Sequence, residues 1–534
     1  MQRFLRHFSA KRTPQGLPIP ASGQVPNNAG GYSWTVDDWT QLDRFLILGS
    51  EGGTYYATEG RLTRENAEAV VRCIQADGPR TIARIIEISE TGRAPKNDPA
   101  LFALALCAAY GSPETKGLAL AKLPQVARIG THLFHFLTYI EGFRGWGRAM
   151  RRSVGTWYNS KTPDQLALQL IKYGARDGWS HRDALRLAHP VPASAAHELL
   201  YHWATKEEPE KQGLEAEPPE LLKAYLQVRE QASAEVAVPL IRRHRLPREA
   251  LPTELLTDAR VWEALLDEMP MEAMIRNLAT MTRVGLLAPM SAASRLVVER
   301  LRDQERLRKA RLHPIKVLAA LVTYQQGFGM RSRESSWNPV TEVVDALNDA
   351  FYLAFGNASP SGKRIVIGLD VSGSMDGGVV AGIPGMTPRV ASAALSLVMT
   401  ATEPDVTTLA FSDQLVPISI SRSQRLDDVV KSVSGIPFGG TDCALPMIWA
   451  TERGIKADAF VILTDSETWF GDIHPAQALR AYREKMGIPA KLIVVGMVAN
   501  RFTIADPTDR AMLDVVGFDT AVPQIMADFI GGRL

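Results

Sequence analysis

The hydrophobic pattern of this chain changes its period once, near residues 355–363. Before this point, from about residue 36, apolar residues recur three and four positions apart, which is typical of amphipathic helices. After it, short apolar runs rich in Val and Ile alternate with helical segments, which is typical of a parallel sheet covered by helices. A chain of 534 residues is also too long for one hydrophobic core. The sequence therefore predicts an all-α region followed by a doubly wound α/β domain.

The helical region is predicted to be an array of stacked helices. None of these helices can bury its apolar face alone, so consecutive helices must pack against each other. We therefore expect a solenoid-like architecture, although no regular repeat period is visible. The clearest predicted helices, each bounded by Pro, Gly or Asp, are 64–76, 79–92, 98–111, 219–231, 258–270, 271–282 and 313–327.

The N-terminal residues 1–31 are polar and rich in Pro and Gly. This composition predicts a flexible arm. The predicted organisation is thus an arm at 1–31, a helical domain at 32–358 and an α/β domain at 360–534.

The cysteines and the apolar runs indicate the compartment. Cys73, Cys107 and Cys443 lie far apart and form no C-x-x-C motif, which favours a reducing environment. No apolar run reaches the ~18 residues that a membrane span needs. We expect a cytoplasmic protein with no membrane contact.

Polar side chains gather at the carboxyl ends of the predicted strands, the edge where open α/β sheets bind ligands. The stretch IGLDVSGS ends an apolar strand with Asp370 and then places Ser372 and Ser374. Asp465 follows another apolar strand, and Thr441 lies in a glycine-rich loop between the two. Carboxylates and hydroxyls of this kind suit Mg²⁺. The sequence predicts a divalent metal site, with Mg²⁺ as the cofactor, at Asp370, Ser372, Ser374, Thr441 and Asp465.

Two other interpretations of these residues stay open. Asp and Ser also cap helices and turns, and a site that forms can still bind its ion weakly. A phosphatase of the Asp-x-Asp type is not supported, because Ser372 occupies the place of the second Asp.

Residues 121–190 carry a local excess of positive charge, with 11 Lys and Arg against 4 Asp and Glu and nine interleaved aromatic residues. Cations bind phosphates, and aromatic rings stack on splayed bases. Helical spacing places Arg148, Arg151 and Arg152 on one basic face. By charge, these arginines and Arg128 are candidate RNA contacts. The alternative is a solvated helix face above an aromatic core.

Several long segments resemble the Ro 60-kDa autoantigen family. They are FLILGSEGGTYYATEGRLTRENAEAV (45–70), KYGARDGWSHRDALRLAHP (172–190), HPIKVLAALVTYQQGFG (313–329), FGGTDCALPMIWA (438–450) and RFTIADPTDR (501–510). The Asp-x-Ser-x-Ser pattern with a later Thr and Asp resembles the metal-ion-dependent adhesion site of von Willebrand factor A domains. From about residue 30 to 534 the chain is similar to a TROVE module joined to such a domain.

The resemblance implies a monomeric, non-enzymatic RNA-binding protein, folded as a ring of HEAT-like helical repeats closed by the A domain. Members of the family bind small noncoding Y RNAs on the outer surface of the ring. Single-stranded 3′ ends of misfolded or aberrant RNAs enter the central hole. Bacterial members are linked through Y RNA to a 3′-to-5′ exoribonuclease such as polynucleotide phosphorylase, in RNA quality control, maturation, decay and stress recovery.

Carried onto this chain, the family's Y RNA contacts fall on Lys172, Arg176 and His189. His189 precedes Pro190, so it also suits the end of a helix. The segment GSEGGTYY marks the family, but the sequence assigns it no chemical role.

Two other functions stay open. The helical array and the metal site could both bind proteins, as a metal-dependent interaction scaffold. A metal-dependent hydrolase at Asp370 and Asp465 would need a general base, and none is evident beside them.

Overall fold

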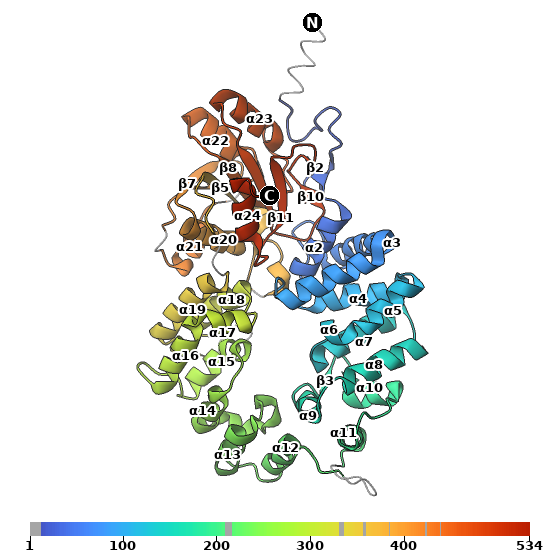
Figure 1. Cartoon of the computed structure of the whole chain (residues 1–534). Coiled ribbons are helices and arrows are strands. Elements are labelled where there is room, and N and C mark those ends of the chain that lie inside the picture. The colour runs from blue at the N-terminus through green and yellow to red at the C-terminus, as the bar shows by residue number, and fades with distance from the viewer. Residues whose placement is uncertain are drawn as a thin grey trace.

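The computed structural model describes residues 12–208, 216–329, 336–355, 359–383, 385–421, 424–437 and 439–534. It contains a helical domain followed by an α/β domain, as the change in hydrophobic period predicts. Figure 1 shows the α/β domain at the top and the helices below it. Among the described residues, no helix combines the length and the apolar composition that crossing a bilayer requires.

The helical domain is almost entirely α-helical. Its short non-α elements are the hairpin strands β3 (Ala175–Arg176) and β4 (Trp179–Ser180) and the 3-10 helices η1 (Arg248–Ala250) and η2 (Thr253–Thr257). Its helices are α2 (Asp38–Leu48), α3 (Glu59–Thr91), α4 (Asp98–Tyr110), α5 (Pro113–Ala121), α6 (Leu123–Val126), α7 (Gly130–Phe143), α8 (Arg148–Asn159), α9 (Pro163–Lys172), α10 (His181–Ala188), α11 (Ala195–Lys206), α12 (Glu220–Glu230), α13 (Ala234–His244), α14 (Ala259–Asp267), α15 (Met271–Arg283), α16 (Ala292–Arg302), α17 (Gln304–Lys309), α18 (Pro314–Gln325) and α19 (Thr341–Ala354).

The helices follow a ring-shaped course. They descend from the α/β domain through α3 to α11, cross at α12 and α13, and return through α14 to α19 (Figure 1). Successive elements pack against each other along this course, including α9 against α12 and α15 against α18. The ring closes beside α18, where His313 Nε2 lies 3.0 Å from the backbone oxygen of Arg93, just after α3.

The helix α3 contains both helices that the sequence predicts at 64–76 and 79–92. Asp77 has a non-helical φ of −158° within it, and Pro79 follows. Because proline lacks an N–H and its ring clashes with the preceding turn, the helix breaks there.

The α/β domain is built on a six-stranded sheet of order β11-β9-β8-β5-β6-β7, in which only β7 is antiparallel to its neighbour. Every residue of β8 is buried, as expected for a strand with both faces covered. The strands are β5 (Arg364–Asp370), β6 (Asp405–Phe411), β7 (Leu415–Ile418), β8 (Ala459–Thr464), β9 (Lys491–Gly496) and β11 (Met512–Val516). The helices are η3 (Gly373–Asp376), η4 (Val380–Gly382), α20 (Pro388–Thr402), α21 (Leu426–Ser434), α22 (Leu445–Arg453), α23 (Pro475–Met486) and α24 (Val522–Gly531).

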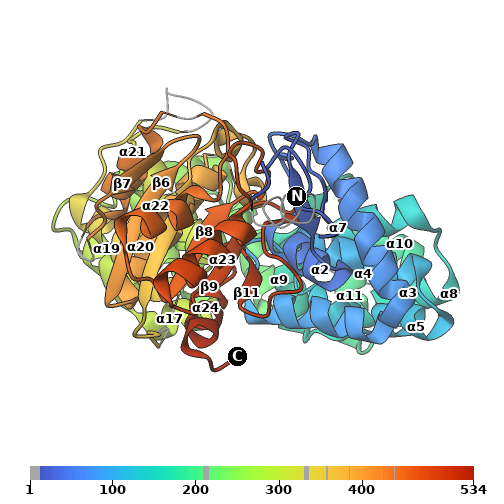
Figure 2. The same ribbon diagram turned by 90° about the horizontal axis from the view of Figure 1, so that it is seen from above.

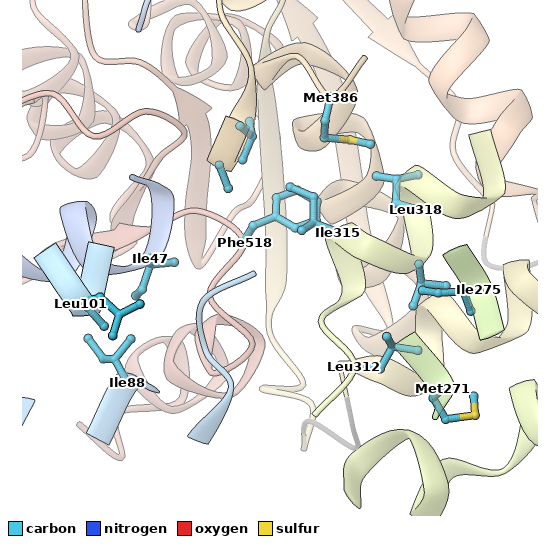
Figure 3. Packing of buried hydrophobic residues seen from close by; sticks show 14 of the residues in the cluster. Ile47, Ile88, Leu101, Met271, Ile275, Leu312, Ile315, Leu318, Met386 and Phe518 are labelled. Atoms are coloured by element: carbon cyan, nitrogen blue, oxygen red, sulfur yellow. The ribbon is translucent and has the colours of Figure 1, made fainter. Parts of the chain in front are cut away.

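The larger hydrophobic core crosses the boundary between the two domains. Figure 3 shows Ile47, Ile88 and Leu101 of the first helices on one side, Leu318 of α18 on the other, and Phe518 of the α/β domain between them. The start and the end of the helical array therefore pack against the same domain.

A buried ion pair fixes the first helix to the sheet. Arg44 of α2 is fully buried and places Nη2 2.7 Å from each carboxylate oxygen of Asp514 in β11. Its Nη1 donates to the backbone oxygens of Asn500 and Phe502 at 2.8 and 2.9 Å. A buried guanidinium needs such partners, because a desolvated charge left alone is very costly.

The prediction of a flexible N-terminal arm is wrong for residues 12–31, whereas residues 1–11 lie outside the described residues. Strands β1 (Val25–Pro26) and β2 (Tyr32–Thr35) form an antiparallel sheet with β10 (Phe502–Thr503). Gln15 is fully buried, and its backbone N–H donates to Gly471 O at 3.0 Å. Figure 2 shows this segment between the α/β domain and α2. Hydrogen bonds hold most of this segment in place, and Ile19 packs into a buried hydrophobic cluster of the α/β domain. No regular hydrophobic pattern in the sequence signals this packing.

Arg44→Ala is expected to lower the free energy of unfolding by about 3–5 kcal/mol, because Asp514, whose side chain is only 11% exposed, is left without its partner. Arg72→Ala is the matched control, since Arg72 pairs with Asp38 on the surface and such pairs contribute about 1 kcal/mol or less. Urea denaturation followed by circular dichroism measures both. Equal losses in the two variants would contradict the proposed anchoring role of Arg44.

Candidate functional site: metal centre and basic surface

The predicted metal residues meet at the carboxyl edge of the sheet. Asp370 ends β5, and Asp465 directly follows β8, which pairs with β5 in parallel. Ser372 and Ser374 lie in the turn after β5. All four side chains are buried. The sheet topology thus brings together residues that are 95 positions apart in sequence, 465 against 370.

Hydrogen bonds connect this group. Ser372 N donates to Asp370 Oδ1 at 2.9 Å, and Thr464 Oγ1 donates to Asp370 Oδ2 at 2.6 Å. The hydroxyl oxygens of Ser372 and Ser374 lie 3.1 Å apart, and the Ser374 side chain lies near Asp465, where it acts against the rise in the Asp465 pKa that burial causes.

Thr441 reaches the same edge from the loop before α22. It is buried, and its backbone oxygen accepts from the N–H groups of Trp469 and Phe470 at 3.1 and 3.0 Å. These contacts hold the Thr441 loop against the loop that follows Asp465.

The electrostatics of the group favour a cation. Burial raises the pKa of Asp370, although hydrogen bonds from Ser372 and Thr464 act against it. Burial also raises the pKa of Asp465, and the charges of Asp370 and Glu467 raise it further. Buried carboxylates that repel each other are stabilised by a positive ion.

The donor set fits Mg²⁺. The side chains offer two carboxylates and several hydroxyls, which are the hard oxygen ligands that this ion prefers. Within the described part of the chain, no group of three or more His, Cys, Asp or Glu side chains is arranged to hold a metal. The site here is instead rich in hydroxyl ligands.

Sequence reasoning missed two residues beside this group. Glu467 is buried and accepts from the backbone N and the side-chain Nδ2 of Asn28 at 2.7 and 2.8 Å. Tyr56, from the helical domain, places its hydroxyl near the Ser374 side chain. Burial, and then the charge of Asp465, raises the pKa of Tyr56. The segment GSEGGTYY was the available signal, but periodicity gives no indication of where such a loop docks.

The basic surface is formed mainly by α8. Arg148, Arg151 and Arg152 are exposed in the first turns of this helix, as their spacing predicts. In the described residues, none of them pairs with an acidic side chain. Positive charges at a helix N-terminus oppose the helix dipole, so they do not serve helix stability. They are available to a negatively charged partner.

The adjoining helix α10 extends this surface. It packs against α8 and exposes Arg182 and Arg186, which sequence reasoning passed over. Their spacing of four residues within RDALR was the signal. We call the exposed residues of α8 and α10 together the α8–α10 surface: Arg148, Arg151, Arg152, Arg182 and Arg186.

The three residues carried over from the family border this surface. Lys172 ends α9, half-exposed, with Nζ 5.4 Å from the Tyr173 ring centre. Arg176 is exposed on the β3–β4 hairpin. His189 is exposed just after α10 with φ 45°, and its backbone N–H closes the helix on Leu185 O at 2.9 Å. His189 therefore ends the helix through its backbone, and its side chain is directed to solvent.

Arg128 is not part of the α8–α10 surface. It is half-buried, and its Nη1 donates to Ser89 Oγ at the end of α3 at 2.8 Å. Burial, and then the neighbouring Arg311, lowers its pKa. Arg128 thus lies near the closure of the ring.

Most of the nine aromatic residues in 121–190 belong to the core of the helical domain, which is the alternative to base stacking that the sequence left open. Phe134, Phe136, Trp157 and Tyr158 are fully buried. They cannot stack on bases without unfolding the array. What the α8–α10 surface offers a ligand is therefore mainly positive charge.

A histidine holds the hairpin that carries Arg176. His135 of α7 places Nδ1 2.5 Å from Asp98 and Nε2 3.2 Å from Asp177, the residue after Arg176. Burial lowers the pKa of His135, but Asp98 and Asp177 outweigh it and the net pKa is raised above its ordinary value of 6.5.

Comparisons with known proteins agree with this architecture. The TROVE domain model matches residues 25–325, and the Ro60 vWA domain model matches residues 364–530. The chain is 42% identical over 537 residues to the RNA-binding protein RO60 of Deinococcus radiodurans, covering 100% of both proteins. It is 38% identical over 600 residues to the RNA-binding protein RO60 of Caenorhabditis elegans, covering 98% of this chain and 92% of the relative. The crystal structure of the Deinococcus radiodurans RO (RSR) protein matches with a TM-score of 0.70 and 42% identity, over 93% of this chain and 100% of that one.

The raised pKa of His135 makes the hairpin sensitive to pH. Protonated His135 stabilises the hairpin through its contacts with Asp98 and Asp177. This stabilisation is complete below pH 6.5 and is lost as the pH rises through the raised pKa of His135. We expect amide exchange in residues 174–180, corrected for its intrinsic rate, to quicken above that pKa in the wild type. His135→Asn should exchange quickly at every pH, whereas His202→Asn on α11 should behave as the wild type. A hairpin with the same pH profile in wild type and His135→Asn would contradict this role.

Proposed function

The chain belongs to the Ro60 family, and on this premise we propose that it binds RNA through the α8–α10 surface. The observation that carries the proposal is the row of exposed arginines in the first turns of α8, which lack acidic partners among the described residues. The basic segment at 300–316 is less suited, because Arg302, Arg306 and Arg308 each pair with a nearby carboxylate.

The α8–α10 surface suits contacts to phosphates. Arginine binds phosphate oxygens in a fixed two-pronged geometry. Contacts of this kind position an RNA without reading its sequence. Because Trp157 and Tyr158, the aromatic residues of α8, are buried, the shape and charge of the RNA are expected to determine what binds here.

The finer features of the proposed function follow from the resemblance to the family. The ligand of the outer surface is a small structured Y RNA, which also contacts Lys172, Arg176 and His189. Single-stranded 3′ ends of misfolded RNA enter the centre of the ring. A 3′-to-5′ exoribonuclease such as polynucleotide phosphorylase acts on them, in RNA quality control and stress recovery. The chain itself catalyses no step.

The metal site is proposed to hold Mg²⁺ with Asp370, Ser372, Ser374, Thr441 and Asp465. The ion supplies positive charge that offsets the buried carboxylates. Asp370 and Asp465 contribute charge, and the hydroxyls contribute neutral oxygens within the same buried edge of the sheet.

One observation favours a second function, a metal-dependent scaffold for proteins. Trp469 and Phe470, whose backbone N–H groups bind the Thr441 carbonyl, keep 41% and 43% of their surface exposed. Exposed aromatic residues are common in protein interfaces. Protein purified from its natural host separates the two functions, since bound RNA raises the ratio of absorbance at 260 and 280 nm.

The double variant Arg151→Glu/Arg152→Glu is expected to weaken binding of a structured Y RNA at least several-fold, because two phosphate contacts become repulsive. The slope of log K against log[salt] should become shallower by about 0.7–0.9 for each lost contact. Gel-shift titrations at several salt concentrations measure both. The control of equal charge is Arg306→Glu/Arg308→Glu, which should bind normally.

The carried-over residues are tested in the same way. Lys172→Glu/Arg176→Glu should lower the affinity for Y RNA several-fold but leave binding of an unstructured oligonucleotide with a free 3′ end less affected. Unchanged affinity for Y RNA would remove these residues from the interface.

One substitution in the metal site is expected to stabilise the metal-free protein and to remove its stabilisation by Mg²⁺. Asp465→Asn should raise the melting temperature of the metal-free protein, because it removes a buried charge that Asp370 repels. It should also abolish the stabilisation by Mg²⁺, which for a wild-type site at 100 times Kd amounts to about 2.7 kcal/mol. Asp428→Ala, an exposed carboxylate of α21, is the control. If adding Mg²⁺ leaves the melting temperature of the wild type unchanged, the proposed metal site is wrong.

A further inference from the structure

The loop at 50–57 of the helical domain lies against the metal-site loop of the α/β domain, and the proposed function gives it no role. A Cβ built on Gly52 would lie 2.6 Å from Val379 Cγ2, and one built on Gly377 would lie 2.7 Å from Tyr55 Cβ. A Cβ on Gly378 would lie 2.7 Å from Gly53 O. Glycines are thus needed on both sides, because the two backbones touch.

A second contact fixes the far end of this pair of loops. The Lys96 ammonium pairs with Glu51 and lies 3.2 Å from the backbone oxygen of Gly382. A Cβ on Gly382 would overlap the Glu51 carboxylate. The loop at 50–57 therefore sits at a defined position above residues 377–382.

Tyr56 extends from this loop into the metal site. It is half-buried, and its hydroxyl lies close enough to the Ser374 side chain to interact with it. The charges of Asp465, Glu467 and Asp370 act on the same hydroxyl. Its neighbour Tyr55 is 62% exposed and contacts Tyr56 edge to face, with ring centres 5.0 Å apart. Of the two tyrosines, only Tyr56 places a hydroxyl among the metal residues.

We propose that Tyr56 is a further member of the metal site, and that the ion it helps to hold links the helical ring to the α/β domain. The inference rests on the proposed metal site. A neutral tyrosine hydroxyl is a hard oxygen donor, as the serine hydroxyls beside it are. Because Tyr56 comes from the helical domain, bound Mg²⁺ and the contact between the two loops stabilise each other.

The experiment uses the full chain, with Mg²⁺ alone as the probe. Isothermal titration calorimetry measures the affinity for Mg²⁺ in the wild type, Tyr56→Phe, Tyr55→Phe and Asp370→Ala. Hydrogen exchange of the amides in residues 50–57, with and without Mg²⁺, measures the link between the domains. Circular dichroism verifies that each variant is folded.

We expect Tyr56→Phe to bind Mg²⁺ roughly 3–10-fold more weakly, in keeping with the loss of one neutral oxygen contact. It should also lose most of the Mg²⁺-dependent slowing of exchange at 50–57. Tyr55→Phe should match the wild type in both measurements. Wild-type affinity and wild-type slowing in Tyr56→Phe would overturn the inference while leaving the metal site intact. If the wild type binds no Mg²⁺, or if Asp370→Ala binds it normally, the metal site itself is wrong and the link falls with it.

Discussion

The arrangement of the two domains depends on a charge buried between them. The guanidinium of Arg44 has no contact with water, and all the partners that satisfy it belong to the α/β domain: Asp514 and the carbonyls of Asn500 and Phe502. Separating the domains would expose an isolated carboxylate and break these hydrogen bonds together. The pair adds little net stability compared with apolar packing, but it strongly penalises any other orientation of α2 on the sheet.

The helical array docks on the α/β domain at both ends. Its first part contributes Arg44 and Arg93, whose Nε lies 3.0 Å from each oxygen of Asp519. Its last part contributes Asp345, which pairs with Arg425 at 2.5 Å, and Gln325, which donates to Asp427 at 2.7 Å. An array held at both ends closes into a ring. The curvature that single helix pairs produce is then fixed by the distance between the two docking points.

The sequence predicts those parts of the structure that follow from periodicity and topology. Helical spacing locates α4, α12, α15 and α18, and the parallel strands bring Asp370 and Asp465 to one edge, because the carboxyl ends of such strands must meet. Parts held mainly by hydrogen bonds leave no such pattern. Gln15 and Asn28 lie in a polar, Pro-rich segment that looks like a flexible arm, yet both are bound by the loops after β8.

Burial decided between alternatives that composition had left open. Trp157 and Tyr158 look like base-stacking platforms in the sequence, but the three-dimensional packing buries them completely. The arginines of α8 stay outside because a guanidinium without a partner cannot be buried. No property of the single residues distinguishes Arg128, which is half-buried beside Ser89, from Arg151, which is exposed. Their environments differ only because Arg128 lies in the connection between α6 and α7, whereas Arg151 lies on the exposed side of α8.

The two charged regions belong to different layers of the molecule, and this separation has a physical reason. The carboxylates of the proposed metal site lie at the buried edge of the sheet, where a low dielectric strengthens their attraction to a cation. The arginines of the proposed RNA-binding surface lie on exposed helices, where salt screens their attraction to a polyanion. Joining a helical ring to a doubly wound sheet supplies each region with its own environment, and the loop at 50–57, which follows Arg44 by only a few residues, places the ring's backbone directly against the metal-site loop.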